Sequence, residues 1–189
     1  FVQSLAAYAF ACKRFVGREV LFYLVLAGLM VPGAMTLIPQ FLITSRMGLL
    51  NSYAGLILPT LAGPLGVFLL RQYMLGIPVS LLDAARIDGC REWAIYWRIV
   101  LPLSLPALGT LAVISFTGHW REFLWPLLVT TDDSMKTLPV GLASLSSQFN
   151  TDYGAQMAGA LLSLLPVIVV FLCLQRYFIG GLTTGAVKK

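Results

Sequence analysis

The sequence predicts an all-α fold, a polytopic bundle of membrane-spanning helices. Of its 189 residues, 58% are hydrophobic and only 11% are charged, and the mean hydropathy is +0.84. Soluble domains average about 45–50% apolar and about 25% charged residues, so a soluble chain of this length would lack the polar side chains to cover its apolar surface. Disordered chains are poorer still in apolar residues. The composition therefore indicates a chain that folds largely within lipid.

Long apolar windows give the positions of the expected helices, because a spanning helix needs about 20 mostly apolar residues. The predicted helices cover residues 20–45, 50–76, 99–130 and 153–178, with an incomplete fifth helix at 1–12. The chain opens inside this last apolar pattern, with no basic stretch before it and no processing site after it, so no signal peptide is predicted. Whether the first residue is a natural end or a truncation stays open.

The distribution of Lys and Arg orients these helices, since cytoplasmic loops carry an excess of basic residues. One side collects only Arg46 and Lys136, with Arg121 near or inside a helix. The other side, predicted to be cytoplasmic and to include the C-terminus, collects Lys13, Arg14, Arg18, Arg71, Arg86, Arg91, Arg98, Arg176, Lys188 and Lys189. These residues are scattered singly rather than gathered in the contiguous patch that nucleic acid requires, so no nucleic-acid partner is predicted.

The largest predicted cytoplasmic loop, residues 77–98, has a pattern of its own: a short helix, a turn and a second helix. Ser80 and Asp83 have the spacing of a capping box at the start of the first helix. Gly89 suits the left-handed conformation that ends a helix. One face of this helix is small and acidic, which suits insertion into a groove with a positive lining; its residues follow helical spacing and are Leu81, Ala84, Ala85 and Asp88.

This loop resembles the E-A-A-x(3)-G-x(9)-I-x-L-P signature of the permease subunits of bacterial ABC importers. The matching residues are Asp83, Ala84, Ala85, Gly89, Ile99, Leu101 and Pro102, with Asp83 in the place of the usual Glu. Four further stretches are similar to the carbohydrate-uptake type, which includes the maltose and glycerol-3-phosphate permeases. They lie at residues 5–18, 120–127, 136–142 and 175–188, and the second matches the family's W-N-[DE]-F-L-W-P-L pattern except for Arg121 in place of Asn.

The resemblance implies the transmembrane-domain fold of a type I ABC importer, in which residues 80–87 form a cytoplasmic coupling helix. The residues expected to contact the ATPase are Asp83, Ala84, Ala85, Asp88 and Gly89, framed by Ser80, Ile99, Leu101 and Pro102. The implied partners are a second permease subunit, two ATP-binding cassette subunits and an extracytoplasmic solute-binding protein. The implied location is the inner (plasma) membrane of a bacterial cell, with the chain crossing the bilayer several times.

The expected function is that of a permease subunit of an ATP-driven importer for sugars or related polyols or glycerol phosphate, forming half of the translocation path. The chain has no G-x-x-x-x-G-K-[ST] phosphate-binding loop, so it is not expected to be an enzyme. No cofactor is expected on this chain, since ATP and Mg would bind to the partner ATPase. The sequence identifies neither the solute nor whether the permease pairs with a copy of itself.

A second candidate site lies at the predicted outer end of the third complete helix. Ionisable residues at membrane depth predict function, and aromatic faces suit sugar rings. The candidates for the translocation path are His119, Trp120, Arg121, Glu122 and Trp125. Anchoring at the membrane interface, where Arg and Trp are common, is the alternative and stays open. The lone histidine and the three scattered cysteines (Cys12, Cys90 and Cys173) predict no metal site and no disulfide framework.

The outer loop, residues 131–153, contains a helical spacing of Leu138, Leu142, Leu145 and Phe149, which predicts a short surface helix. The resemblance implies that this loop helps to dock the binding protein; a plain connector is the alternative. For the chain as a whole, the main alternative is a secondary, ion-coupled transporter. It is disfavoured because no inverted repeat is visible and few charges fall within the predicted helices. An intramembrane enzyme would need a paired catalytic set that the sequence does not offer.

Overall fold

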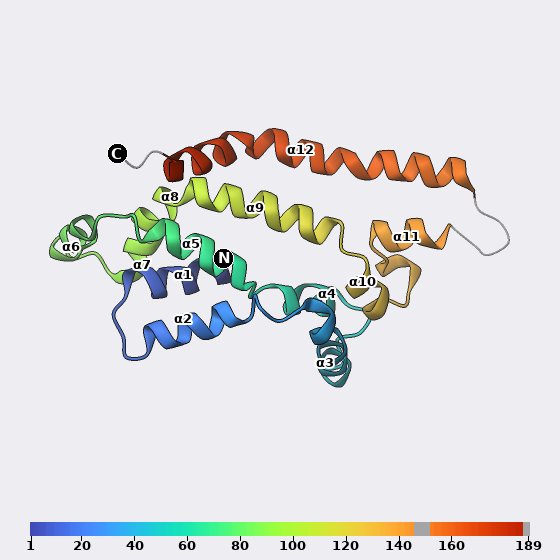
Figure 1. The fold of residues 1–189 in the computed structure, drawn as a ribbon, viewed down its shortest axis with the longest axis horizontal. Helices are drawn as coiled ribbons and strands as arrows, with labels where there is room; N and C mark the ends of the chain where they lie inside the picture. The colour runs from blue at the N-terminus through green and yellow to red at the C-terminus, as the bar shows by residue number, and fades with distance from the viewer. Residues whose placement is uncertain (146–151, 187–189) are drawn as a thin grey trace. The chain divides into compact units, whose positions relative to one another are not determined.

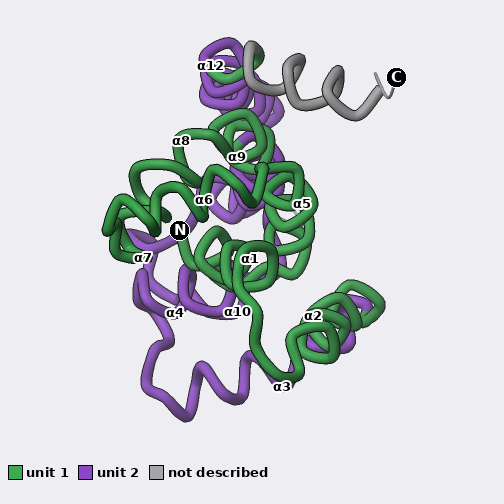
Figure 2. Tube along the Cα trace, turned by 90° about the vertical axis from the view of Figure 1, so that its left-hand side faces the viewer, with its two compact units in different colours: residues 1–31, 61–112, 174–189 green, residues 32–60, 113–173 purple. Residues whose placement is uncertain are grey.

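The computed structural model describes residues 1–145 and 152–186, with side chains up to residue 175. All regular secondary structure in these residues is helical, which confirms the predicted all-α class. The chain forms two compact units, coloured separately in Figure 2. Unit 1 comprises Phe1–Val31, Leu61–Ala112 and Leu174–Lys189, and unit 2 comprises Pro32–Thr60 and Val113–Cys173.

Unit 1 contains the start of the chain and the predicted cytoplasmic loop (Figure 1). Its helices are α1 (Val2–Cys12), α2 (Arg18–Ala27), α5 (Pro64–Met74), α6 (Val79–Ile87), α7 (Glu92–Ile95), α8 (Leu101–Leu103) and the first half of α9 (Leu105–Trp120). Both views show α1 and α5 side by side. Pro64 opens α5, at the first helical position, where its missing N–H costs nothing.

The core of unit 1 joins α1 and α5 to the loop helices. It is built from Ala7, Tyr8, Leu70, Met74, Ile77, Leu82, Ala85, Ile95, Tyr96, Val100 and Ala107. Within it, the hydroxyls of Ser4 and Tyr96 lie 2.8 Å apart in a buried hydrogen bond. The core includes the small residues Ala7, Ala85 and Ala107. Small residues at a contact let two helices approach closely. The helices of the loop 77–98 are therefore packed against α1 and α5.

Unit 2 contains α3 (Gly33–Arg46), α4 (Tyr53–Ile57), the second half of α9, α10 (Leu124–Val129), α11 (Leu138–Ser144) and the start of α12 (Tyr153–Ala186). Short 3₁₀ turns lie at Leu58–Thr60 and Asp133–Met135. Asn51 joins two of its loops: its side-chain oxygen accepts hydrogen bonds from the backbone N–H groups of Thr131 and Asp132, at 3.1 and 3.0 Å. Its own N–H donates to the Val129 carbonyl at 2.7 Å.

The expected long helices are interrupted more often than the apolar windows indicate. The window 20–45 contains two helices, α2 and α3, which are separated at residues 28–32. Pro32 explains the break, because the residue before a proline is driven out of the helical region. Among the described residues, one helix, Tyr153–Gln175, is long and apolar enough to cross a membrane by itself. The number rises to three if each of two bent helix pairs is one span.

Candidate functional site

The start of α6 differs from the predicted capping box. The helix begins at Val79 with Pro78 as its capping residue, and no side chain caps it. Ser80 therefore lies within the first turn, two positions after the capping residue, and its hydroxyl does not serve as the cap. Asp83 does not reach back; its carboxylate accepts a hydrogen bond from Nη1 of Arg86 at 2.6 Å. The capping-box prediction is wrong because the helix starts two residues earlier than the box requires.

The end of α6 confirms the predicted conformation of Gly89. Its φ is +79°, in the left-handed region. The N–H of Cys90 donates to the Ala85 carbonyl at 2.9 Å, and that of Gly89 donates to the Arg86 carbonyl at 3.0 Å. This pair of bonds is the Schellman motif, which satisfies the last carbonyls of a helix. A glycine here fixes the sharp turn from α6 into α7.

The two faces of α6 have different surroundings. Leu82 and Ala85 are buried in the core of unit 1. Ile87 is 86% exposed, and the same outer face carries Leu81, Ala84 and Asp88. The predicted outer face is thus corrected at one position, since Ala85 packs inward with Leu82. Sequence spacing alone missed Ile87, an exposed apolar side chain at the end of this short helix.

A cluster of charged and polar side chains fixes α6 and α7 to the end of α1. Glu92, at the start of α7, accepts hydrogen bonds from the Tyr8 hydroxyl at 2.8 Å and from Nε of Arg86 at 3.1 Å. It also forms an ion pair with Lys13. Glu92 lies in the loop 77–98, outside the predicted spanning helices, and the hydrogen bond from Lys13 is the main reason that its pKa falls to about 2. Glu92 in turn raises the pKa of Arg86.

Sequence reasoning missed this cluster, which we call the Glu92 cluster (Tyr8, Lys13, Arg86 and Glu92). Tyr8 and Glu92 are separated by 84 residues, so no local spacing connects them. Leu82 and Ala85 give α6 a buried apolar attachment to the core of unit 1, and the Glu92 cluster adds a polar attachment to α1. What remains free is the outer face of α6.

The framing residues Ile99, Leu101 and Pro102 lie between the loop 77–98 and α9. Residues Tyr96–Val100 form a π-helical turn, followed by α8, which contains Leu101 and Pro102. Pro102 has no N–H to donate to the carbonyl four residues earlier, so a regular α-helical ladder cannot continue here. Ile99 and Leu101 are half-buried and pack against the core of unit 1, whereas Pro102 is exposed.

The second candidate stretch lies in unit 2. Arg121 lines an open cavity of about 510 Å³ with Val113, Ile114, Thr117 and Gly118. His119 is exposed, whereas Trp120 stacks on Phe116, with 5.5 Å between ring centroids, and donates from Nε1 to the Ser163 carbonyl at 3.0 Å. Arg121 is therefore the residue of this stretch that lines the cavity.

Two of the predicted path residues have structural contacts. Trp125 is buried, and its Nε1 donates to the Gly55 carbonyl at 3.2 Å. On another side Gly55 lies against the Leu49 carbonyl, and a Cβ at its position would lie 2.1 Å from that oxygen. Glu122 is exposed and accepts a hydrogen bond from the Trp125 N–H at 3.4 Å. Both residues position α10.

The outer loop forms the predicted short helix in part. α11 covers Leu138 and Leu142, and Leu145 follows directly after it. Phe149, the fourth residue of the predicted pattern, lies outside the described residues. Across the part of the chain that the structure describes, no group of three or more His, Cys, Asp or Glu side chains gathers in a way that could hold a metal ion.

Comparisons with known proteins agree on one family. The family model described as "Binding-protein-dependent transport system inner membrane component" matches residues 3–183. The arabinooligosaccharides transport system permease protein AraQ of Bacillus subtilis (strain 168) is 45% identical over 188 residues, covering 100% of this chain and 67% of the relative. The sn-glycerol-3-phosphate transport system permease protein UgpE of Yersinia pestis bv. Antiqua (strain Antiqua) is 41% identical over 183 residues, covering 96% and 65%.

A solved structure is similar as well. It is the crystal structure of a bacterial ABC transporter involved in the import of the acidic polysaccharide alginate. The TM-score is 0.79 at 28% sequence identity, and the match covers 94% of this chain and 69% of the other. The chain spans about two thirds of the length of the curated relatives it matches.

Proposed function

The chain belongs to the family of binding-protein-dependent transport system inner membrane components, and on that basis we propose that it forms half of the translocation path of an ATP-driven importer. Members of this family are multi-pass permease subunits of the inner membrane that bind no cofactor and are not catalytic; ATP is hydrolysed by a partner subunit. The alternative of an ion-coupled secondary transporter is set aside, because the whole matched region is that of an ABC permease.

The partners in this proposal are an ATPase, an extracytoplasmic binding protein and a second permease. The family name itself implies a binding protein. We place the C-terminus and the loop 77–98 on the cytoplasmic side, on the ground of the Lys and Arg distribution. The outer loop with α11 then faces the binding protein. For the solute we propose an oligosaccharide or a glycerol phosphate, the classes carried by the similar permeases.

The observation that carries the coupling proposal is the asymmetry of α6. Its inner face is fixed in unit 1 by Leu82 and by the Glu92 cluster, whereas its outer face is open. A helix held on one side and exposed on the other transmits a push from a docked partner to the membrane helices behind it. This is the rigid-body type of switching, in which packed elements move as units.

We assign a separate role to each predicted coupling residue. Ala84 and Asp88, together with Ile87, form the face that would enter the ATPase. Asp83 is engaged by Arg86, so Asp88 is the carboxylate that we propose is presented to a basic residue of the partner. Ala85 and Gly89 act indirectly: Ala85 packs in the core of unit 1, and Gly89 sets the turn into α7.

For the translocation path we propose Arg121, together with its exposed neighbour His119. The guanidinium offers several hydrogen-bond donors in a planar group, which suits hydroxyls and phosphate oxygens. Its position beside Thr117 in an open cavity supports this role. Trp120 lies next to it, and Glu122 and Trp125 hold the adjoining α10 in position.

The test is ATPase coupling in vesicles that contain the full-length permease, its partner permease, the ATP-binding subunits and the loaded binding protein. Ile87→Gln and Asp88→Lys are expected to lower binding-protein-stimulated ATPase activity by about tenfold, a change of about 1.4 kcal/mol in coupling. Asp88→Glu, which keeps the exposed carboxylate, is the matched control and is expected to retain full stimulation, whereas Ile87→Gln and Asp88→Lys are the two test variants. Full stimulation in both test variants would refute the assignment of α6 as the coupling helix.

A further inference from the structure

Unit 1 contains a basic cavity that the transport proposal does not use. It has a volume of about 570 Å³ and lies between the end of α1, the following loop and α6. Four cationic side chains, those of Lys13, Arg14, Arg18 and Arg86, line it together with the carboxylates of Asp83 and Glu92. The lining therefore has a net charge of +2, and its ligand is expected to be an anion.

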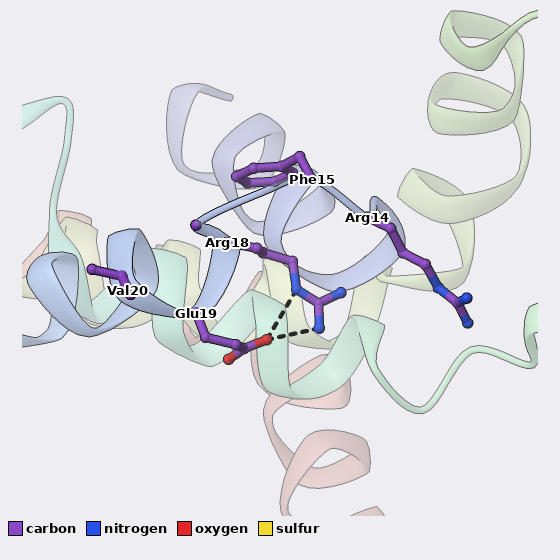
Figure 3. Close-up of a pocket in the computed structure, with 6 residues that line it drawn as sticks. Arg14, Phe15, Arg18, Glu19 and Val20 are labelled. Atoms are coloured by element: carbon purple, nitrogen blue, oxygen red, sulfur yellow. Dashed lines mark hydrogen bonds and ion pairs between the residues drawn. The ribbon is translucent and has the colours of Figure 1, made fainter.

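Most of these charges already have partners. Glu92 pairs with Lys13 and Arg86, and Arg18 pairs with Glu19 at 2.7 Å. Arg14 forms no ion pair or hydrogen bond among the residues that the structure describes. Figure 3 shows Arg18 turned toward Glu19, whereas the side chain of Arg14 extends away from both. Arg14 thus supplies an uncommitted guanidinium at the mouth of the cavity.

The residues beside this guanidinium are apolar and exposed. Val16 has a relative exposure of 101%, and Phe15 and Val20 are also exposed. A second cavity of about 420 Å³ shares Arg14 and Arg18 with the first and is also lined by Phe15, Gly17, Val20 and Glu19, the partner of Arg18 (Figure 3). A site for a soluble anion such as free phosphate would not need exposed apolar side chains beside it. Alternating cationic and apolar side chains at the end of a membrane helix are typical of segments that lie in the bilayer interface.

We propose that this cavity binds the headgroup of an anionic phospholipid. The phosphodiester contacts the guanidinium of Arg14 with support from Arg18, and the acyl chains lie along the exposed apolar side chains of the loop and α2. Basic pockets between membrane helices are known to take anionic lipid headgroups, and each basic residue near the surface contributes to the attraction. The proposal does not depend on which side of the membrane the loop faces.

The site adjoins the coupling helix, because Asp83 and Arg86 of α6 line the same cavity. A bound phosphodiester competes with Asp83 and Glu92 for the guanidinium of Arg86, so it is expected to weaken the attachment of α6 to α7. Anionic lipid is therefore expected to modulate ATPase coupling as well. This second consequence rests on the proposed function, whereas lipid binding itself does not.

The experiment uses the full-length permease in its assembled transporter, in phosphatidylcholine nanodiscs with increasing phosphatidylglycerol. Lipid retained by the complex is measured by native mass spectrometry, without ATP. We expect retention of phosphatidylglycerol that falls about fivefold in Arg14→Gln and recovers in Arg14→Lys, which keeps the charge. Arg46→Gln removes one exposed cation from the end of α3 and is the matched control, expected to retain lipid as the parent does.

Three results would overturn the proposal. The first is no preference for phosphatidylglycerol over phosphatidylcholine in the parent transporter. The second is equal displacement of the lipid by inorganic phosphate or by soluble glycerophosphoglycerol at the same concentration, which would indicate a site for a soluble anion. The third is loss of subunit assembly in Arg14→Gln that is independent of lipid, which would indicate a protein partner. Lipid retention is measured without turnover, so failure of the coupling proposal would not affect it.

Discussion

Nε of Arg86 donates a hydrogen bond of 3.1 Å to the carboxylate of Glu92, and this contact joins α6 to α7 across the Gly89 turn. The same carboxylate accepts a hydrogen bond of 2.8 Å from Tyr8 in α1. The Glu92 side chain therefore links α6 and α7 to α1. Glu92 is a positioning residue in this arrangement, since it does not lie on the face that would meet the ATPase.

Glu92→Gln tests this positioning role. The amide keeps the size of the side chain but loses the charge that attracts Lys13 and Arg86. Because the Glu92 side chain is half exposed, each lost pair is expected to cost only about 0.2–1 kcal/mol of stability. Stimulation of ATPase activity is expected to fall several-fold while subunit assembly, measured by size-exclusion chromatography, is retained. Unchanged stimulation would show that α6 moves without this link.

The pH dependence of stability follows from the same residue. The pKa of Glu92 is lowered from its usual 4.5 to about 2, so folding favours the charged carboxylate. Its contribution is fully present above pH 4.5 and is lost as the pH falls from there toward 2. The difference in thermal unfolding midpoint between the parent and Glu92→Gln is expected to shrink over this range. A difference that stays constant from pH 6 to pH 3 would contradict the role of the charge.

Gly89→Ala is expected to strain the turn after α6. A Cβ at φ +79° costs about 1–2 kcal/mol, although no neighbouring atom lies within 4 Å of the position. The loss therefore comes from the backbone and not from a clash. Asn tolerates the left-handed region better than Ala, so Gly89→Asn is the matched variant and is expected to retain more stability in a thermal unfolding assay. Equal effects of Ala and Asn would argue against this explanation.

Trp125→Phe separates packing from transport at the second site. The change keeps an aromatic ring but removes the indole N–H that donates to the Gly55 carbonyl. The cost is expected to be about 1 kcal/mol of stability, with little change in the KM for solute uptake. Arg121→Gln is expected to do the reverse, raising KM while leaving the unfolding midpoint close to that of the parent. If Trp125→Phe by itself raises the KM for solute uptake, Trp125 lines the translocation path.

The sequence predicts the helical class and the family well, because both depend on composition and on motifs that stay together along the chain. It also predicts the conformation of Gly89, which is a local property. It does not predict the Glu92 cluster, because Tyr8 and Glu92 are 84 residues apart in the sequence. The start of α6 is also mispredicted, because Pro78 fits the position before the first turn and so displaces Ser80 from the cap. Long-range contacts and competing caps are what spacing alone cannot decide.

Arg71 makes a further long-range contact that spacing does not predict, between α5 and α2. Its guanidinium lies 3.8 Å from the centroid of the Phe22 ring, and its Nη2 lies 3.1 Å from the Glu19 carboxylate. The Arg71 side chain is only 10% exposed, so loss of either partner leaves a nearly buried cation. Glu19→Gln is expected to cost about 1–3 kcal/mol, because the nearly buried charge of Arg71 then lacks its carboxylate partner.

Arg71→Lys tests whether the contact between α5 and α2 needs only a positive charge or also the planar shape of the guanidinium. Lysine keeps the charge but lacks the planar group that stacks on Phe22 while it bonds to Glu19, so Arg71→Lys is not a conservative change here. We expect Arg71→Lys to lower the thermal unfolding midpoint nearly as much as Glu19→Gln does. The double variant is expected to cost less than the sum of the two, because both changes disrupt the same contact. Full additivity would mean that Arg71 and Glu19 act independently, and α2 would then be held to α5 by its apolar side chains alone.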